Sequence, residues 1–176
     1  MRWFWLDRFT EFVSGDRATA LKAVSLSEDH LHDHWHAWPV MPHSLIAEGM
    51  AQASGLLVSE SYRFAELVVL AKFSKCTFHG PVRPGETLTY HAKIDQLNDS
   101  GASAAVTGHV GERLQAQAEI FFARLNPQDL GRGDNIRLFN PEHLLHWLRL
   151  VGVFEVGVDA HGERLRVEDY QFNAEP

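Results

Sequence analysis

The chain has 176 residues, 45% hydrophobic and 22% charged, which is typical of one globular domain or of one domain with an appendage. The single cysteine, Cys76, excludes an intrachain disulfide and a thiolate zinc cluster. The formal net charge of −7 argues against a nucleic-acid-binding protein, because such proteins usually carry a concentrated basic face.

The start of the chain gives no sign of a targeting or membrane-spanning segment. Charges interrupt the apolar residues between Met1 and Phe12, whereas a signal peptide needs an unbroken apolar core. The longest apolar run, Leu67–Ala71, is far too short to cross a bilayer. We therefore expect a cytoplasmic protein without membrane contact.

The first predicted elements are a strand and an extended connector. Residues Ala18–Leu26 have a strand-like composition and follow a Ser-Gly-Asp turn signal. The next stretch, Ser27–Trp38, is polar and dense in histidine. Pro39 and Pro42 then restrict the backbone, so an extended connector without a helix is expected between them.

A long buried helix is predicted over Ser44–Tyr62. Ser44 is a suitable N-cap residue. Many small residues along this stretch suit a helix in close backbone contact with its surroundings. The apolar residues that recur at helical spacing are Leu45, Ile46, Met50, Ala53, Leu56 and Leu57.

After this helix the period of the apolar residues changes to two, which is typical of strands. The predicted strands cover Leu67–Phe78, the alternating residues 88–94, Ala102–Val110 and Arg113–Leu125. A strand, a long helix and several antiparallel strands together indicate an α+β fold, in which one sheet wraps one helix.

The last part of the chain is predicted to be a small appendage. Asn126-Pro127 marks a boundary, and a second helix is expected to start at Asn140-Pro141-Glu142 and to end near Leu150. About 50 residues are too few for a confident independent domain, so this segment is expected to pack on the main body. The predicted parts are a main body over 1–125 and an appendage over 126–176 that ends in a hairpin of 153–158 and 164–172.

The histidine-rich stretch raises the question of a metal site. Four of its histidines alternate along the chain, and an extended backbone would place them on one side. Imidazole is a common zinc ligand, but four ligands along one strand are too widely spread to converge on one ion. We therefore expect a solvated polar segment and no metal. The four residues are His30, His32, His34 and His36.

Glu48 is the second candidate, because it is a carboxylate in the middle of the most apolar predicted helix. Burial favours the protonated form of a carboxyl group, which suits a general acid. Gln52 follows one helical turn later and could hold the carboxyl in place. These residues alone leave open whether Glu48 is a functional acid or a solvated helix residue.

The run from His34 to Gln52 resembles the active-site signature of the 3-hydroxyacyl-acyl-carrier-protein dehydratases, which are hot-dog-fold enzymes of type II fatty acid synthesis. That signature has a catalytic His, then P-V/I-M-P-G, then L-I-x-E-A-x-A-Q. Here Glu48 follows His34 by fourteen residues, which fits. The resemblance covers roughly residues 5–125, and its other matching segments are Leu6–Arg8, Ala20–Ser25 and Phe78–Glu86.

The resemblance implies a hydro-lyase without a cofactor that reversibly dehydrates (3R)-hydroxyacyl thioesters of acyl carrier protein or coenzyme A to trans-2-enoyl thioesters. His34 would be the base and Glu48 the acid, and Gln52 and the backbone at His43 would position the substrate. The resemblance also implies a homodimer, or a trimer of dimers, in which the His of one subunit meets the acid of the other.

Several positions depart from the family pattern. Asp33 stands in place of a Gly, Trp35-His36 in place of Phe-Pro, and His43 in place of the Gly after P-V-M-P. Two alternatives therefore stay open. A hot-dog thioesterase would need Glu48 but not His34, and an acyl-binding or scaffold protein would need no catalysis at all.

An acidic carrier protein would need a local basic patch, because neither part of the chain is basic overall. Lys75 and Arg83 flank the P-V-x-P-G-like turn and are the candidates for carrier docking. The alternative, that both are ordinary solvated residues, stays open at this point.

Overall fold

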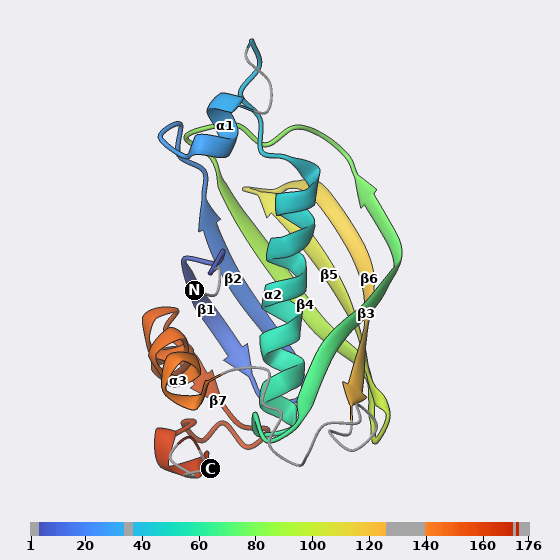
Figure 1. The fold of residues 1–176 in the computed structure, drawn as a ribbon, viewed down its shortest axis with the longest axis vertical. Coiled ribbons are helices and arrows are strands. Elements are labelled where there is room, and N and C mark those ends of the chain that lie inside the picture. The colour runs from blue at the N-terminus through green and yellow to red at the C-terminus, as the bar shows by residue number, and fades with distance from the viewer. Residues whose placement is uncertain (1–3, 34–36, 126–139, 171, 173–176) are drawn as a thin grey trace.

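A computed structural model describes residues 4–33, 37–125, 140–170 and 172 of the chain. Figure 1 shows one curved sheet with a long helix lying against its concave face. The elements in chain order are β1 (Arg8–Val13), β2 (Arg17–Ala23), α1 (Asp29–Asp33), α2 (His43–Ser61), β3 (Leu67–Phe78), β4 (Thr87–Asn98), β5 (Gly101–Val110), β6 (Arg113–Leu125), α3 (Pro141–Leu150), α4 (Val153–Val156), β7 (Gly157–Val158) and the 3-10 turn η2 (Val167–Asp169).

Within the described residues, seven strands form one sheet in the order β3-β6-β5-β4-β2-β1-β7. Neighbouring strands are antiparallel, except that β7 runs parallel to β1. Helix α2 packs on strands β2 to β6. The predicted α+β arrangement of one sheet wrapped around one helix is confirmed.

Period-two patterning explains which face of the sheet meets α2. In β4 the alternating apolar residues are buried, while their neighbours on the other face are exposed or half-buried. The predicted bounds of β3 and β6 agree with the structure, because turn residues and alternation define both strands. The buried residues of β4 that face α2 are Leu88, Tyr90, Ala92 and Ile94.

Three predictions about local structure are wrong. The N-cap of α2 is Pro42 rather than Ser44, so the helix begins at His43. The stretch Ser27–Trp38, expected to be a solvated polar strand or loop, contains the short helix α1. The predicted C-terminal hairpin is replaced by α4, β7 and η2, with a single antiparallel bridge between Val158 and Arg164.

The C-terminal residues cover the β1 edge of the sheet. Helix α3 starts as predicted, because the Asn140 side chain accepts hydrogen bonds from the backbone N–H groups of Glu142 (3.0 Å) and His143 (3.2 Å). The Phe9 N–H donates to the Val151 carbonyl at 2.7 Å, and β7 pairs with the end of β1. The strand β1 itself was not predicted from the sequence.

A buried carboxyl group joins the end of α2 to the C-terminal residues. Glu60 is 2% exposed, and the Tyr170 hydroxyl donates a hydrogen bond to its Oε1 at 2.7 Å. Burial raises the pKa of Glu60 above its ordinary value of 4.5, and the hydrogen bond from Tyr170 opposes this shift. Arg63 also lies over the Tyr170 ring, at 5.2 Å from its centroid.

This raised pKa predicts a pH-dependent stability. The folded protein holds the Glu60 proton more tightly than the unfolded chain, so stability falls as pH rises from about 4.5 to the folded-state pKa and is level above it. A glutamine side chain cannot titrate, so Glu60→Gln should lose less stability over this window. Melting temperatures of both proteins across the acid range test this, and parallel curves would contradict it.

Candidate active site

The approach to α2 is fixed by backbone contacts. The Met41 N–H donates to the Val82 carbonyl at 2.8 Å, and both of these side chains are buried. The N–H groups of Leu45 and Ile46 donate to the Pro42 carbonyl at 3.0 and 3.1 Å. The earlier N–H groups of the first turn have no acceptor within the helix, because none precedes them. They are donors at the positive end of the helix dipole.

His43, which stands where the family pattern has glycine, lies against the wall of a groove. Its ring stacks on Phe78 with centroids 4.2 Å apart and an interplanar angle of 1°. The groove has a volume of about 900 Å³ and opens beside the first turn of α2. It is lined by Trp38, Val40, Met41, Pro42, His43, Ser44, Phe78, His79, Gly80 and Pro81.

Glu48 lies in the second turn of the helix and is half-buried. The Gln52 side-chain amide donates to Glu48 Oε1 at 2.7 Å, so the predicted contact between them is confirmed. Gln52 Oε1 in turn accepts a hydrogen bond from the backbone N–H of Trp5 at 2.9 Å. Because the Trp5 N–H can only donate, it turns the amide oxygen of Gln52 toward itself and the amide N–H toward Glu48.

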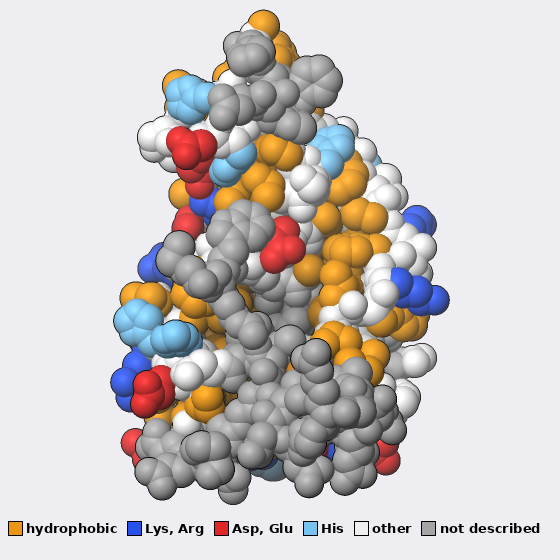
Figure 2. Space-filling model, viewed as in Figure 1, with side chains coloured by type: hydrophobic (Ala, Val, Ile, Leu, Met, Phe, Trp, Pro, Cys, Tyr) orange, Lys and Arg blue, Asp and Glu red, His pale blue; other side chains and the backbone are white. Residues whose placement is uncertain are grey.

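Glu48 and Gln52 line a second, smaller pocket of about 190 Å³. The remaining lining is largely apolar and comes from α2, β3, β6 and α3. Figure 2 shows hydrophobic side chains gathered on this face of the molecule, between α2 and β3. The other lining residues are Ala51, Gly55, Leu56, Ser59, Val68, Leu70, Phe122 and Trp147.

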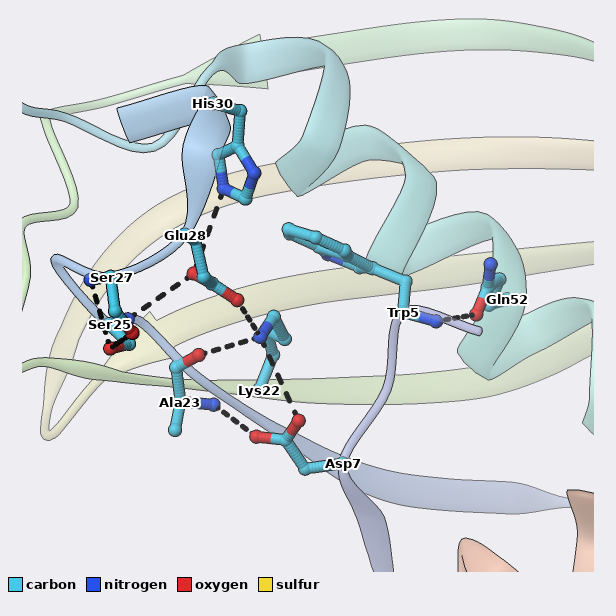
Figure 3. A network of polar contacts seen from close by, with 9 residues as sticks. All are labelled: Trp5, Asp7, Lys22, Ala23, Ser25, Ser27, Glu28, His30 and Gln52. Carbon is cyan, nitrogen blue, oxygen red and sulfur yellow. Dashed lines mark hydrogen bonds and ion pairs between the residues drawn. The ribbon is translucent and has the colours of Figure 1, made fainter. Parts of the chain in front are cut away.

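A buried lysine supports the segment that orients Gln52. Lys22 is 6% exposed and donates to Glu28 Oε1 at 2.6 Å and to the Ala23 carbonyl at 2.8 Å. Its ammonium lies 3.7 Å from an Asp7 carboxylate oxygen and 4.6 Å from the centroid of the Trp5 ring (Figure 3). Buried charges need such partners, so this network fixes the position of Trp5.

The alternating pattern of β2 already contains a sequence signal for this network. Lys22 shares one face of β2 with buried Ala18 and Ala20, so a charge lies in the apolar half of an alternating pattern. Asp7 lies in the Leu6–Arg8 segment of the family resemblance, and its carboxylate accepts the Ala23 N–H at 2.6 Å.

The structure places only part of the histidine-rich stretch. His30 and His32 lie in α1, and the His30 ring packs near Trp5 at 5.2 Å between centroids. His34, Trp35 and His36 lie outside the described residues. Among the residues that the structure does describe, no group of three or more His, Cys, Asp or Glu side chains could hold a metal ion.

The two candidate docking residues are exposed but differ in their surroundings. Lys75 lies on β3, opposite Glu119 of β6. The Arg83 guanidinium lies 4.5 Å from the centroid of the Trp38 ring, at the rim of the larger groove. Over the described part of the chain, no helix is both long and apolar enough to span a bilayer.

Comparisons with known proteins agree with this architecture. Residues 3–119 match the family model described as FabA-like domain. Two relatives named 3-hydroxyacyl-[acyl-carrier-protein] dehydratase FabZ are 34% identical over 119 residues (Clostridioides difficile strain 630; 67% of this chain and 84% of the relative) and 36% identical over 118 residues (Oenococcus oeni; 66% and 85%).

Solved structures confirm the hot-dog fold. A protein of Streptococcus mutans UA159, crystallised bound to acetyl CoA, superposes with a TM-score of 0.59. It shares 15% sequence identity, and the match covers 71% of this chain and 93% of that one. At this identity the likeness concerns the fold alone.

Proposed function

This chain belongs to the family of FabA-like domain proteins, and on that premise we propose that it reversibly dehydrates (3R)-hydroxyacyl thioesters to trans-2-enoyl thioesters, as a hydro-lyase of fatty acid synthesis. The observation that carries the proposal is Glu48, held by Gln52 at 2.7 Å beside an apolar pocket. The relatives named as dehydratases support the same reaction.

The reaction needs a base for the C2 proton and an acid for the hydroxide that leaves from C3. His34 is suited to the first step, because imidazole titrates near neutral pH. Glu48 is suited to the second step as the residue that gives a proton to the leaving hydroxide. Because the Gln52 amide donates to Oε1, the proton that Glu48 gives to the leaving hydroxide would be carried on Oε2.

Negative charge develops on the thioester oxygen when the C2 proton leaves. The N–H groups that begin α2, around His43, would stabilise this charge together with the helix dipole. The His43 ring is held against Phe78, so the side chain that replaces glycine occupies one wall of the groove. We place the thioester arm of the substrate in this groove.

We propose that the protein is a cytoplasmic homodimer joined along β3. This strand has twelve residues and, in the described structure, pairs with β6 on one side only. Leu70, on β3 beside the Glu48 pocket, is 45% exposed. A long edge strand with exposed apolar side chains is usually covered by a partner. Such a dimer would bring His34 of one subunit to Glu48 of the other.

We also propose that residues 126–176 are an extension of a dehydratase domain formed by residues 1–125. The matched family region ends at residue 119, before the extension begins. The pairing of β7 with β1 covers the opposite edge of the sheet, and this leaves β3 as the edge available to a partner.

A hydration assay on the purified protein tests the proposed reaction. Crotonyl-thioester should lose its conjugated enoyl absorbance as water adds, with the thioester intact. Thioester hydrolysis without hydration would instead favour a thioesterase. Binding of acyl thioesters with neither reaction would favour the acyl-binding alternative.

A second test concerns the carrier. We propose that Lys75 and Arg83 steer an acidic carrier protein toward the groove, and Arg83 lies at its rim. Substituting Glu for both Lys75 and Arg83 reverses their charge. It should slow turnover of the carrier-bound crotonyl substrate by about tenfold at low salt, and the effect should shrink as salt is added. The crotonyl-coenzyme A substrate is the matched control, and equal effects on both substrates would remove the docking role.

A further inference from the structure

The extension contributes a large aromatic side chain to the pocket that holds Glu48. Trp147 lies on α3, is 5% exposed and lines the pocket together with Leu56 and Ser59 of α2. Helix α3 begins at Pro141, beyond the region that matches the FabA-like model. This wall of the pocket is therefore a feature of this chain rather than of the matched domain.

Trp147 is held rigidly. Its ring stacks on Phe4 with centroids 4.5 Å apart and an interplanar angle of 20°. Its helix is fixed at the start by the Asn140 cap and at the end by the bond from the Phe9 N–H to the Val151 carbonyl. A side chain stacked and anchored in this way cannot rotate freely to enlarge the pocket.

The pocket follows one face of α2, starting at the candidate acid. Its α2 residues from Glu48 to Ser59 recur every three to four positions, so they form a single stripe along the helix. Figure 1 shows α3 at the level of the C-terminal half of α2, away from its first turn. Trp147 lines this stripe from α3.

We propose that Trp147 closes the acyl-chain pocket and restricts the enzyme to short acyl chains, an inference that rests on the proposed dehydration. A hydrocarbon tail attached at C3 of a substrate at Glu48 would lie along the apolar stripe. The pocket is small, about 190 Å³, so a long tail in it would have to pass the Trp147 ring.

The test compares crotonyl, octenoyl and dodecenoyl thioesters of one carrier. Wild type should hydrate crotonyl and octenoyl substrates well and the dodecenoyl substrate poorly. Trp147→Ala should raise the ratio of kcat/KM for dodecenoyl over crotonyl by about tenfold or more, since each additional buried methylene is worth about fourfold. Trp147→Leu should raise it less, and provides a second variant if the alanine protein does not fold.

Leu148→Ala is the matched control, because Leu148 is a fully buried neighbour on α3 that does not line the pocket. It should lower the melting temperature without changing the chain-length ratio. The inference would be overturned if the dodecenoyl-to-crotonyl ratio were unchanged in both Trp147 variants, or if it changed equally in Leu148→Ala. In either case, turnover of the crotonyl substrate would still support the proposed dehydratase activity. Absence of hydration at every chain length would instead remove the proposed function, and this inference with it.

Discussion

His34→Ala and Glu48→Gln are each expected to lower the hydration rate by about 10²–10⁴-fold while the fold and the dimer stay intact. His34→Ala removes the base that takes the C2 proton. Glu48→Gln keeps the shape of the side chain and its neighbour Gln52, but it removes the acidic proton that the departing hydroxide needs. Initial rates with crotonyl-thioester measure both effects, and circular dichroism and gel filtration check the fold and the dimer.

Matched controls exist for both substitutions. Glu60→Gln removes a carboxyl from the same helix, but Glu60 bonds Tyr170 and does not line the Glu48 pocket. His32→Ala removes an exposed imidazole on α1. Both control proteins should keep the wild-type rate. Full activity in His34→Ala would contradict the dehydratase mechanism, and loss of thioester hydrolysis in Glu48→Gln alone would favour the thioesterase.

The central part of the fold was predictable because its patterns are long. Strands β3 and β6 each contain a dozen or more residues with turn signals at their ends, and their predicted bounds agree with the structure. The predicted start of α2 was wrong by one residue. The N-cap is Pro42, and no serine side chain caps the helix. The contact between Glu48 and Gln52 could be predicted from helical spacing alone, because residues four positions apart are neighbours on a helix.

The missed elements depend on contacts that are distant in sequence. Charges interrupt the apolar pattern of β1, which is recognisable as a strand only through its pairing with β2. Strand β7 has two residues and exists because it pairs with β1. Trp147 reaches the Glu48 pocket from α3, although 99 residues separate it from Glu48 in the sequence. No periodicity within either segment could have brought these two residues together.

Gly49→Ala is expected to destabilise the protein by about 1–3 kcal/mol, although the family pattern carries alanine at this position. A Cβ on Gly49 would overlap the Cζ and hydroxyl of Tyr90, whose side chain is fully buried on β4. An alanine in a helix interior would otherwise stabilise by about 0.5–1 kcal/mol. The Tyr90 ring occupies the space that an alanine methyl group would need at position 49, so the effect of a substitution at either residue depends on the other. Urea unfolding measures the difference.

Gly55→Ala on the same helix is the matched control, because its Cβ would make a tight contact with the Phe122 ring, at 3.3 Å, but no overlap. It should be close to neutral. Combining Gly49→Ala with Tyr90→Leu should recover part of the loss, with a coupling of about 0.5–3 kcal/mol between the two sites. Additive effects would contradict the packing argument. Because Gly49 adjoins Glu48, a shift of α2 that relieves the overlap would also move the carboxyl away from Gln52, so Gly49→Ala should lower the hydration rate even where the protein stays folded.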